Sequence, residues 1–289
     1  MESAGQRGCR GLGVIPRAHI TAWRAVAPWS TDAQVEQDLI LSRALVQIFS
    51  ESTLSSHVAF RGGTALHKLF LNPASRYSED IDLVQVVAEP IGPTLTALHK
   101  ILDSWLGEPR RKQSEGRATL IYRFDSEIAP ITPLRLKVEI NTREHFSVFG
   151  YIRRKFKVKS SWFNGETELV TYSIEELLGT KLRALYQRKQ GRDLFDLAVA
   201  FEKVPKLDAK KVVTCFLRYV EHEGASVSRA EFESNLLEKL ADPIFSQDIS
   251  PLLVLGEHPS PALHPQNAGR TVMDKLIALI PGEAWKGGN

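Results

Sequence analysis

Apolar and polar residues follow two different spacings along the chain, which predicts helices and strands in mixed order. Residues 31–51 carry apolar side chains at helical intervals, and Thr31 with Gln34 has the spacing of an N-terminal capping box. We therefore expect a helix to begin after Thr31. Helical patterns also cover residues 64–70 and 95–105, and the first of these directly follows a pair of glycines.

Alternating patterns predict the strands of a sheet, in which successive side chains point to opposite faces. The strand patterns cover residues 58–60, 80–86, 118–124 and 134–141. The last pattern is the clearest, because one of its faces is wholly apolar. Its opposite face consists of Arg135, Lys137, Glu139 and Asn141. Asp80 and Asp82 share one face of their own strand, and the polar face of 134–141 can lie beside them.

From Ser173 onward the spacing of apolar residues is helical, up to a last helix over residues 272–280 that follows a proline-rich connection. We therefore expect an α/β domain over residues 16–165 and a helical C-terminal domain over residues 166–289. Residues 1–15 contain two arginines but no apolar run behind them. A disordered leader is expected there rather than a secretory signal.

The composition is that of an ordinary globular protein, since 43% of the 289 residues are hydrophobic and 25% are charged. No run of about 18 uncharged apolar residues occurs, so a soluble protein with no membrane partner is expected. The two cysteines, Cys9 and Cys215, cannot form a disulfide framework or a four-cysteine zinc site, which suits a cytoplasmic location. A formal net charge of +3 gives only a mild bias toward anionic partners.

Two groups of residues point to chemistry on phosphates. Gly62 and Gly63 stand at the start of an expected helix, where glycine lets backbone N–H groups approach an anion closely. Asp80 and Asp82 share a strand face, and Glu139 from a neighbouring strand would complete a carboxylate set for Mg²⁺. Two such ions can clamp the attacking and leaving oxygens of a phosphoryl transfer.

Each of these features also has a simpler explanation. A glycine pair is often only a turn, and an Asp-x-Asp strand can simply face solvent. Glu139 lies between Arg135 and Lys137 on its strand face, which is typical of a surface ladder of charge pairs. The combination favours a functional site, because a phosphate-binding turn and a pair of metal ligands occur within one short region.

Residues 62–64 (GGT) followed by residues 78–82 (SEDID) resemble the motif of polymerase-β-like nucleotidyltransferases. The wider segments FRGGTALHKL, RYSEDIDLV, KVEIN and KLRALYQRKQGRDLFDL resemble the AbiEii/MenT toxin family of bacterial nucleotidyltransferases. The similarity extends from Trp23 to Phe201, about 60% of the chain. It implies a polymerase-β-like domain with a mixed sheet, whose active-site cleft is completed by the helical C-terminal domain.

The resemblance also implies roles for individual residues. The residues expected to bind the nucleotide are Gly62, Gly63, Thr64, Ser78, Lys181, Arg192 and Asp193. The expected metal ligands are Asp80, Asp82 and Glu139, and the expected catalytic residues are Asp80, Asp82, Lys181 and Asp196. The simpler alternatives are a solvated helix residue for Lys181 and a helix cap for Asp193. We expect Lys181 and Asp196 to face Asp80 and Asp82 across the cleft.

A basic segment lies near the end of the expected α/β domain. Its cations are Arg153, Arg154, Lys155, Lys157 and Lys159, and apolar residues are interleaved with them. This pattern suits contact with an RNA backbone, and we expect the segment at the rim of the cleft. An exposed strand edge protected by lysines would show the same pattern.

The resemblance implies a toxin-type enzyme that uses Mg²⁺ or Mn²⁺ as cofactor and an NTP as substrate. The expected reaction transfers NMP to an RNA acceptor, the tRNA 3′ end, and blocks translation, and a cognate antitoxin is the expected protein partner. The alternatives are transfer to a protein side chain, or a non-catalytic protein of the same fold that binds nucleic acid or an antitoxin. An Asp-x-Asp glycosyltransferase is disfavoured, because it would leave the GGT turn unexplained.

Overall fold

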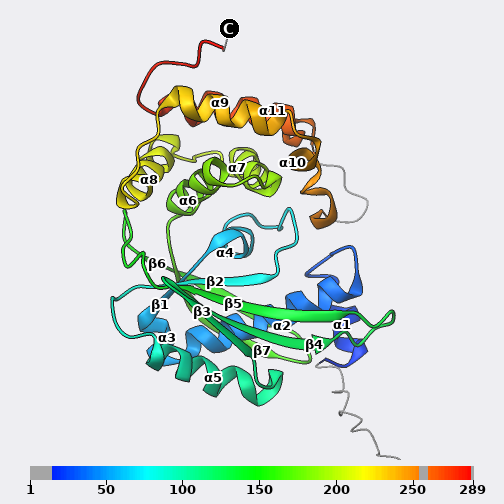
Figure 1. The fold of residues 1–289 in the computed structure, drawn as a ribbon. Helices are drawn as coiled ribbons and strands as arrows, with labels where there is room; N and C mark the ends of the chain where they lie inside the picture. Colours follow the sequence, from blue (N-terminus) through cyan, green and yellow to red (C-terminus); the bar gives the residue numbers. More distant parts are fainter. Residues whose placement is uncertain (1–14, 254–259, 288–289) are drawn as a thin grey trace, which may run out of the picture.

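A mixed sheet of seven strands forms the centre of the protein (Figure 1). The computed structural model describes residues 15–253 and 260–287, so Cys9 and nearly all of the expected leader at 1–15 lie outside the described residues. The strands are β1 (Val58–Arg61), β2 (Asp80–Gln85), β3 (Arg110–Ser114), β4 (Arg117–Asp125), β5 (Pro133–Asn141), β6 (Ile152–Lys159) and β7 (Asn164–Thr171). Their order across the sheet is β3-β4-β5-β2-β1-β7-β6.

The pairing of β2 with β5 decides which polar side chains become neighbours. This pair and β1–β7 are parallel, and the remaining pairs are antiparallel, so the expected α/β class with a mixed sheet is confirmed. In the β2–β5 register, Asp80 lies opposite Lys137 and Asp82 lies opposite Glu139. The expected proximity of the polar face of β5 to the two aspartates is therefore also confirmed.

Helices cover both faces of the sheet (Figure 1). One face carries α1 (Arg17–Trp23), α2 (Asp32–Ser50), α3 (Ser52–His57) and α5 (Gly92–Leu106). The other face carries α4 (Gly62–Leu69), and beyond it lie α6 (Ile174–Gln187), α7 (Gly191–Lys203), α8 (Ala209–His222), α9 (Arg229–Leu240), α10 (Pro243–Gln247) and α11 (Pro265–Lys275). Within residues 15–253 and 260–287, no helix is both long enough and apolar enough to cross a membrane.

Local sequence signals set the ends of the first helices. Thr31 and Gln34 form the expected capping box of α2, in which the Oγ1 of Thr31 accepts from the Gln34 N–H and the Oε1 of Gln34 accepts from the Thr31 N–H, each at 3.2 Å. α2 then packs against the sheet with most of its residues buried. α4 begins at Gly62, two residues before the expected helical pattern at 64–70, because the glycines themselves form its first turn.

The structure differs from the expected pattern at β3, at the end of the sheet and in the last helix, and the sequence patterns do not predict α1 and α3. β3 has no alternating pattern, because all five of its residues are polar and exposed, and this edge strand is therefore invisible to hydrophobic periodicity. β7 continues the sheet to Thr171, past the expected domain boundary at residue 165, and α6 follows directly. α11 ends at Lys275, and a 3₁₀ turn at Ile277–Leu279 replaces the rest of the helix expected over 272–280, because Leu276 has a φ of −119°, far from the helical value.

Candidate active site

The first turn of α4 lies directly against the carboxylates of β2. Gly62 has a φ of +79°, which favours glycine, and a Cβ at this position would lie 2.2 Å from Oδ2 of Asp82. A Cβ on Gly63 would lie 2.5 Å from Nη2 of Arg76. Both positions therefore need glycine, because functional side chains pack against the backbone. The side chain of Arg61 does not cap the helix, so the first turn of α4 can donate N–H groups to an anion.

Three carboxylates lie together on β2 and β5. Asp80 and Asp82 lie two residues apart on β2, and Glu139 lies opposite Asp82 on β5. Burial raises the pKa of Asp82, and the charges of Asp80 and Glu139 raise it further. The Oδ1 atom of Asp80 is buried and accepts no hydrogen bond from the described residues. A cluster of negative charge with an unsatisfied buried oxygen suits a divalent cation that prefers oxygen ligands.

Two cations contact these carboxylates. The Nζ atom of Lys137 lies 3.2 Å from Oδ2 of Asp80 and 3.0 Å from Oε2 of Glu139. The Nε atom of Arg117 lies 3.2 Å from Oε1 of Glu139. Across the described ranges, no group of three or more His, Cys, Asp or Glu side chains is arranged, as it stands, to hold a metal ion. In this conformation two of the three candidate metal ligands, Asp80 and Glu139, are thus bound to ammonium and guanidinium groups of the chain itself.

Thr64 connects α4 to the start of β2. Its Oγ1 donates a hydrogen bond to the backbone oxygen of Asp80 at 2.6 Å and lies 2.8 Å from Oγ of Ser78. Thr64 is almost fully buried and does not line the cleft, whereas Gly62, Gly63 and Ser78 do. The side chain of Thr64 therefore positions the start of β2 and Ser78 and does not itself face the cleft.

Lys181 on α6 is held by two carboxylates of α7. Its Nζ lies 2.8 Å from Oδ1 of Asp193 and 2.9 Å from Oδ2 of Asp196. Burial alone would raise the pKa of both aspartates, but Lys181 with Arg188 lowers the pKa of Asp193, and Arg76 with Lys181 lowers that of Asp196. Lys181 is buried, so it is not the solvated helix residue of the simpler alternative. Asp193 lies in the first turn of α7, but the N-cap is Gln190, so Asp193 is not the helix cap either.

Arg76 and His67 complete this buried network, although the sequence patterns predict no role for either. Arg76 donates from Nε to Oδ1 of Asp196 at 2.6 Å and from Nη2 to Oδ2 at 2.7 Å. Nε2 of His67 lies 2.8 Å from the same Oδ1, and burial lowers the pKa of His67 to about 4, so the ring is neutral at pH 7. The only hint in the sequence is that Arg76 lies four residues before Asp80 within RYSEDIDLV.

A cleft of about 1250 Å³ joins the glycine turn of α4, the carboxylates of β2 and β5, and Lys181. Its walls include the start of α4, the residues before β2, β2 itself, the β3–β4 turn, β5 and α6, and they carry ten Lys and Arg against seven Asp and Glu. Lys181 and Arg192 line the same cleft as Asp80 and Asp82, as expected. Asp196 does not line it, because Arg76, Lys181 and His67 enclose its carboxylate, which is 0% exposed. The expectation that Asp196 faces the aspartates across the cleft is therefore wrong.

The basic strand β6 lies at the far edge of the sheet, separated from β2 by β1 and β7. Its cations Arg153, Arg154, Lys155, Lys157 and Lys159 are exposed, but none of them lines the cleft, so the expected position at the cleft rim is wrong. Lys157 pairs with Glu166 of β7 at 3.2 Å. The strand thus has the exposed, lysine-protected edge that the simpler explanation describes.

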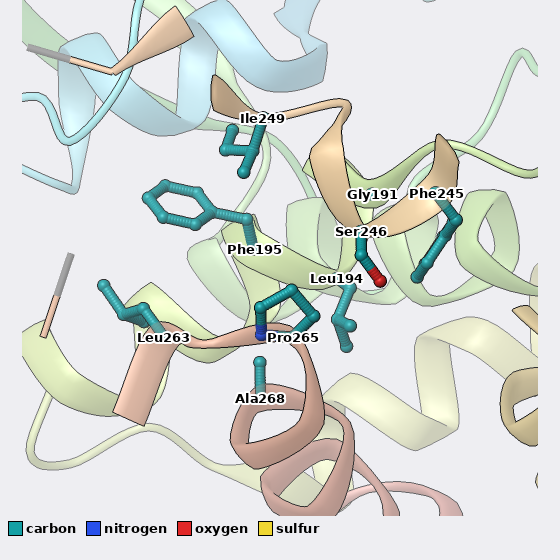
Figure 2. Close-up of a pocket in the computed structure, with 9 residues that line it drawn as sticks. All are labelled: Gly191, Leu194, Phe195, Phe245, Ser246, Ile249, Leu263, Pro265 and Ala268. Atoms are coloured by element: carbon teal, nitrogen blue, oxygen red, sulfur yellow. The ribbon is translucent and has the colours of Figure 1, made fainter. Parts of the chain in front are cut away.

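A small apolar cavity lies between α7, α10 and α11, where Phe195, Ile249 and Leu263 approach one another (Figure 2). Its volume is about 10 Å³, which is close to the space that one water molecule needs. We therefore regard it as a packing defect of the helical layer and not as a ligand site.

The mixed sheet, the glycine turn beside Asp80 and Asp82, and the helical layer that supplies Lys181 define a nucleotidyltransferase. The model of the nucleotidyl transferase AbiEii toxin family, from type IV toxin-antitoxin systems, matches residues 43–264, about three quarters of the chain. The protein belongs to this family of nucleotidyltransferase toxins.

The chain can be compared with solved structures. MenT4, a nucleotidyltransferase toxin from Mycobacterium tuberculosis H37Rv, is 14% identical and superposes with a TM-score of 0.62 over 90% of this chain and 89% of MenT4. JHP933 from Helicobacter pylori is 20% identical, with a TM-score of 0.47 over 86% of this chain and 92% of JHP933. No curated protein sequence matches the chain. The likeness to MenT4 supports the fold, and the roles of single residues rest on the geometry above.

Proposed function

We propose that this toxin transfers NMP from an NTP to the 3′ end of an RNA, with tRNA as the acceptor, in a reaction that needs Mg²⁺ or Mn²⁺. The observation that carries the proposal is that one cleft contains the glycine turn of α4, the carboxylates of β2 and β5, and the ammonium of Lys181. Phosphoryl-transfer enzymes act mainly by positioning reactants and stabilising charge on the phosphoryl group. The cleft offers groups for both tasks.

In this proposal, the triphosphate binds at the N-terminus of α4. The backbone N–H groups of Gly62 and Gly63 contact phosphate oxygens, because neither residue has a side chain that would keep an anion away. Ser78 adds a hydroxyl, which Thr64 holds at 2.8 Å. The sheet region, expected over residues 16–165, thus binds the nucleotide, and the helical region closes the cleft.

Asp80, Asp82 and Glu139 would hold the divalent ion. The residues fit such an ion, because Oδ1 of Asp80 is buried without a hydrogen bond and Asp82 lies beside two further carboxylates. When bound there, the ion would neutralise phosphate charge and stabilise the attacking and leaving oxygens. The carboxylates themselves can accept a hydrogen bond from the acceptor hydroxyl and so orient it at this side of the sheet.

The helical layer supplies cations for the phosphates. Asp193 and Asp196 fix the ammonium of Lys181 at 2.8 and 2.9 Å, which keeps its position at the cleft wall well defined. A cation fixed in this way stabilises charge on the transferred group without reorganising during the reaction. Arg192, which also lines the cleft, adds a second cation for the triphosphate. Asp193 and Asp196 therefore act as positioning residues for Lys181.

The cleft also has room and charge for an RNA end. Its volume of about 1250 Å³ exceeds the range of roughly 300–1,000 Å³ of small-molecule pockets. Arg117, Arg135 and Arg143 line it with side chains that are more than half exposed, so they can contact the phosphates of an acceptor. β6 lies roughly 14 Å from β2, three strand spacings away, and its cations can contact a more distant part of a large RNA.

An added nucleotide at the tRNA 3′ end would remove the hydroxyl that accepts the amino acid, and so would block translation. A cognate antitoxin as partner and a cytoplasmic location belong to the same proposal. The type IV toxin-antitoxin family to which the chain belongs supports the antitoxin.

The test is to incubate the purified protein and Mg²⁺ with each labelled NTP, together with total tRNA or with a protein extract. Asp80→Asn, which removes one carboxylate charge but keeps the shape of the side chain, serves as the inactive control. Label at the 3′ end of tRNA supports the proposal. Label in protein favours a side-chain acceptor, and no label with any NTP favours a non-catalytic binding protein.

A further inference from the structure

Lys137 occupies a central position among the candidate metal ligands. It lies on β5 directly opposite Asp80, and its ammonium contacts Oδ2 of Asp80 at 3.2 Å and Oε2 of Glu139 at 3.0 Å. Its side chain is 27% exposed, so the pair is partly shielded from solvent and from salt. The ammonium therefore binds two of the three carboxylates on which the proposed function depends.

A divalent ion needs the same two carboxylates. Mg²⁺ and Mn²⁺ bind carboxylate oxygens at about 2.0–2.2 Å, and the Lys137 ammonium lies 3.0–3.2 Å from Oδ2 of Asp80 and Oε2 of Glu139, so the two positive charges would be close enough to repel each other strongly. This repulsion favours departure of Lys137 from Asp80 and Glu139 when a metal ion binds. Lysine suits such a movement, because its flexible stem carries a compact charge that can turn to another anion.

We infer that Lys137 is an internal cation that competes with the divalent metal and couples metal binding to nucleotide binding. Without nucleotide, the ammonium stabilises the cluster of carboxylates and keeps metal affinity low. When a triphosphate is present, the displaced ammonium pairs with phosphate oxygens in the same cleft, which Lys137 also lines. This inference rests on the proposed function, since it assumes that these carboxylates bind metal.

Mn²⁺ binding to the purified full chain tests the inference without any turnover. Free Mn²⁺ is measured by electron paramagnetic resonance in wild type, Lys137→Met and Arg135→Met. Arg135 is the matched control, because it lies two residues earlier on the same strand face and pairs with Glu79 at 3.5 Å instead of a metal ligand. Lys137→Met should bind Mn²⁺ at least about tenfold more tightly than wild type, and Arg135→Met should change the affinity by less than about threefold.

A second measurement tests the coupling. Inorganic triphosphate is added, and its chelation of Mn²⁺ is the same in every sample, so differences between variants report on the protein. The gain in Mn²⁺ affinity on adding triphosphate should be roughly tenfold smaller in Lys137→Met than in wild type. Lys137→Arg, which keeps the charge, should bind Mn²⁺ as weakly as wild type.

The outcomes separate this inference from the proposed function. Equal Mn²⁺ affinity in wild type and Lys137→Met would overturn the inference and leave the metal site intact. No Mn²⁺ binding by either protein, with or without triphosphate, would overturn the metal site and the inference together. Circular dichroism and thermal unfolding check the fold of each variant, and Lys137→Gln replaces Lys137→Met if the methionine variant does not fold.

Discussion

The Gly62→Ala substitution tests whether the glycine turn holds Asp82 in its working position. At a φ of +79°, an alanine adds roughly 1–2 kcal/mol of backbone strain. Its Cβ would lie 2.2 Å from Oδ2 of Asp82, where an ordinary contact begins at 3.4 Å, so the carboxylate must move by about 1 Å. A displacement of this size in a reacting group lowers the rate by roughly 10²-fold.

Gly150→Ala is the matched control for this substitution. Gly150 has a φ of +83°, but nothing lies within 4 Å of its added Cβ, so alanine there introduces the strain without the collision. Gly150→Ala should lower the free energy of unfolding by roughly 1–2 kcal/mol, and Gly62→Ala should lower it by at least as much because it adds the collision. Each kcal/mol corresponds to roughly 2–4 °C in Tm. Only Gly62→Ala should lose roughly 100-fold in kcat/KM for transfer of labelled NMP. Wild-type turnover in Gly62→Ala, or an equal loss in Gly150→Ala, would refute the reasoning.

Three further predictions follow from the buried charges and from β6. Arg76→Met should lower the free energy of unfolding in urea by roughly 3–5 kcal/mol, because Asp196 loses its bidentate partner in a fully buried site. The control Arg135→Met should lower it by less than about 1 kcal/mol, and similar losses in the two variants would contradict the prediction. Burial raises the pKa of Glu36 from 4.5 to about 7, so the native protein holds a proton that the unfolded chain releases, and stability falls as pH rises between these values. Glu36→Gln should therefore have a higher free energy of unfolding than wild type at pH 8, by at most ~3 kcal/mol, and this advantage should vanish at pH 4. A difference that stays unchanged across this pH range would disprove the assignment. Neutralising the three exposed lysines of β6 should weaken RNA binding. The slope of log affinity against log salt concentration should become smaller by about 0.7 per lost phosphate contact, and an unchanged slope would exclude β6 from the RNA site.

Much of the candidate site could be predicted because its parts are short and local. The glycine pair, the Asp80–Asp82 spacing and the alternating face of β5 each depend on backbone geometry within a few residues. Even the position of Glu139 beside the aspartates could be expected from such patterns, because polar strand faces tend to lie on the same side of a sheet. The register of β2 and β5 confirms this position. The capping box at Thr31 is predictable for the same reason, because it joins residues only three positions apart.

β3 and β6 show where local patterns stop being informative. β3 has no apolar face, because an edge strand with five exposed residues needs none, so periodicity could not reveal it. The basic pattern of β6 predicts a strand with cations but carries no information about its place in the sheet. That place depends on the pairing of β7 with β1, which sets β6 at the far edge and away from the cleft.

The chemistry that the site can offer, namely an anion-binding turn, a pair of aspartates and a distant lysine, is readable in the order of the amino acids. The pairing of the charges depends on how the chain folds. Arg76 and Asp196 are 120 residues apart, and Lys137 and Asp80 are 57 apart, and no local rule connects them. Burial gives these pairs their energetic weight, because a charge that is removed from water is destabilising unless an opposite charge lies next to it. The ionisable groups can therefore be listed from the sequence, but tertiary packing determines which of them are buried in pairs and which face the cleft.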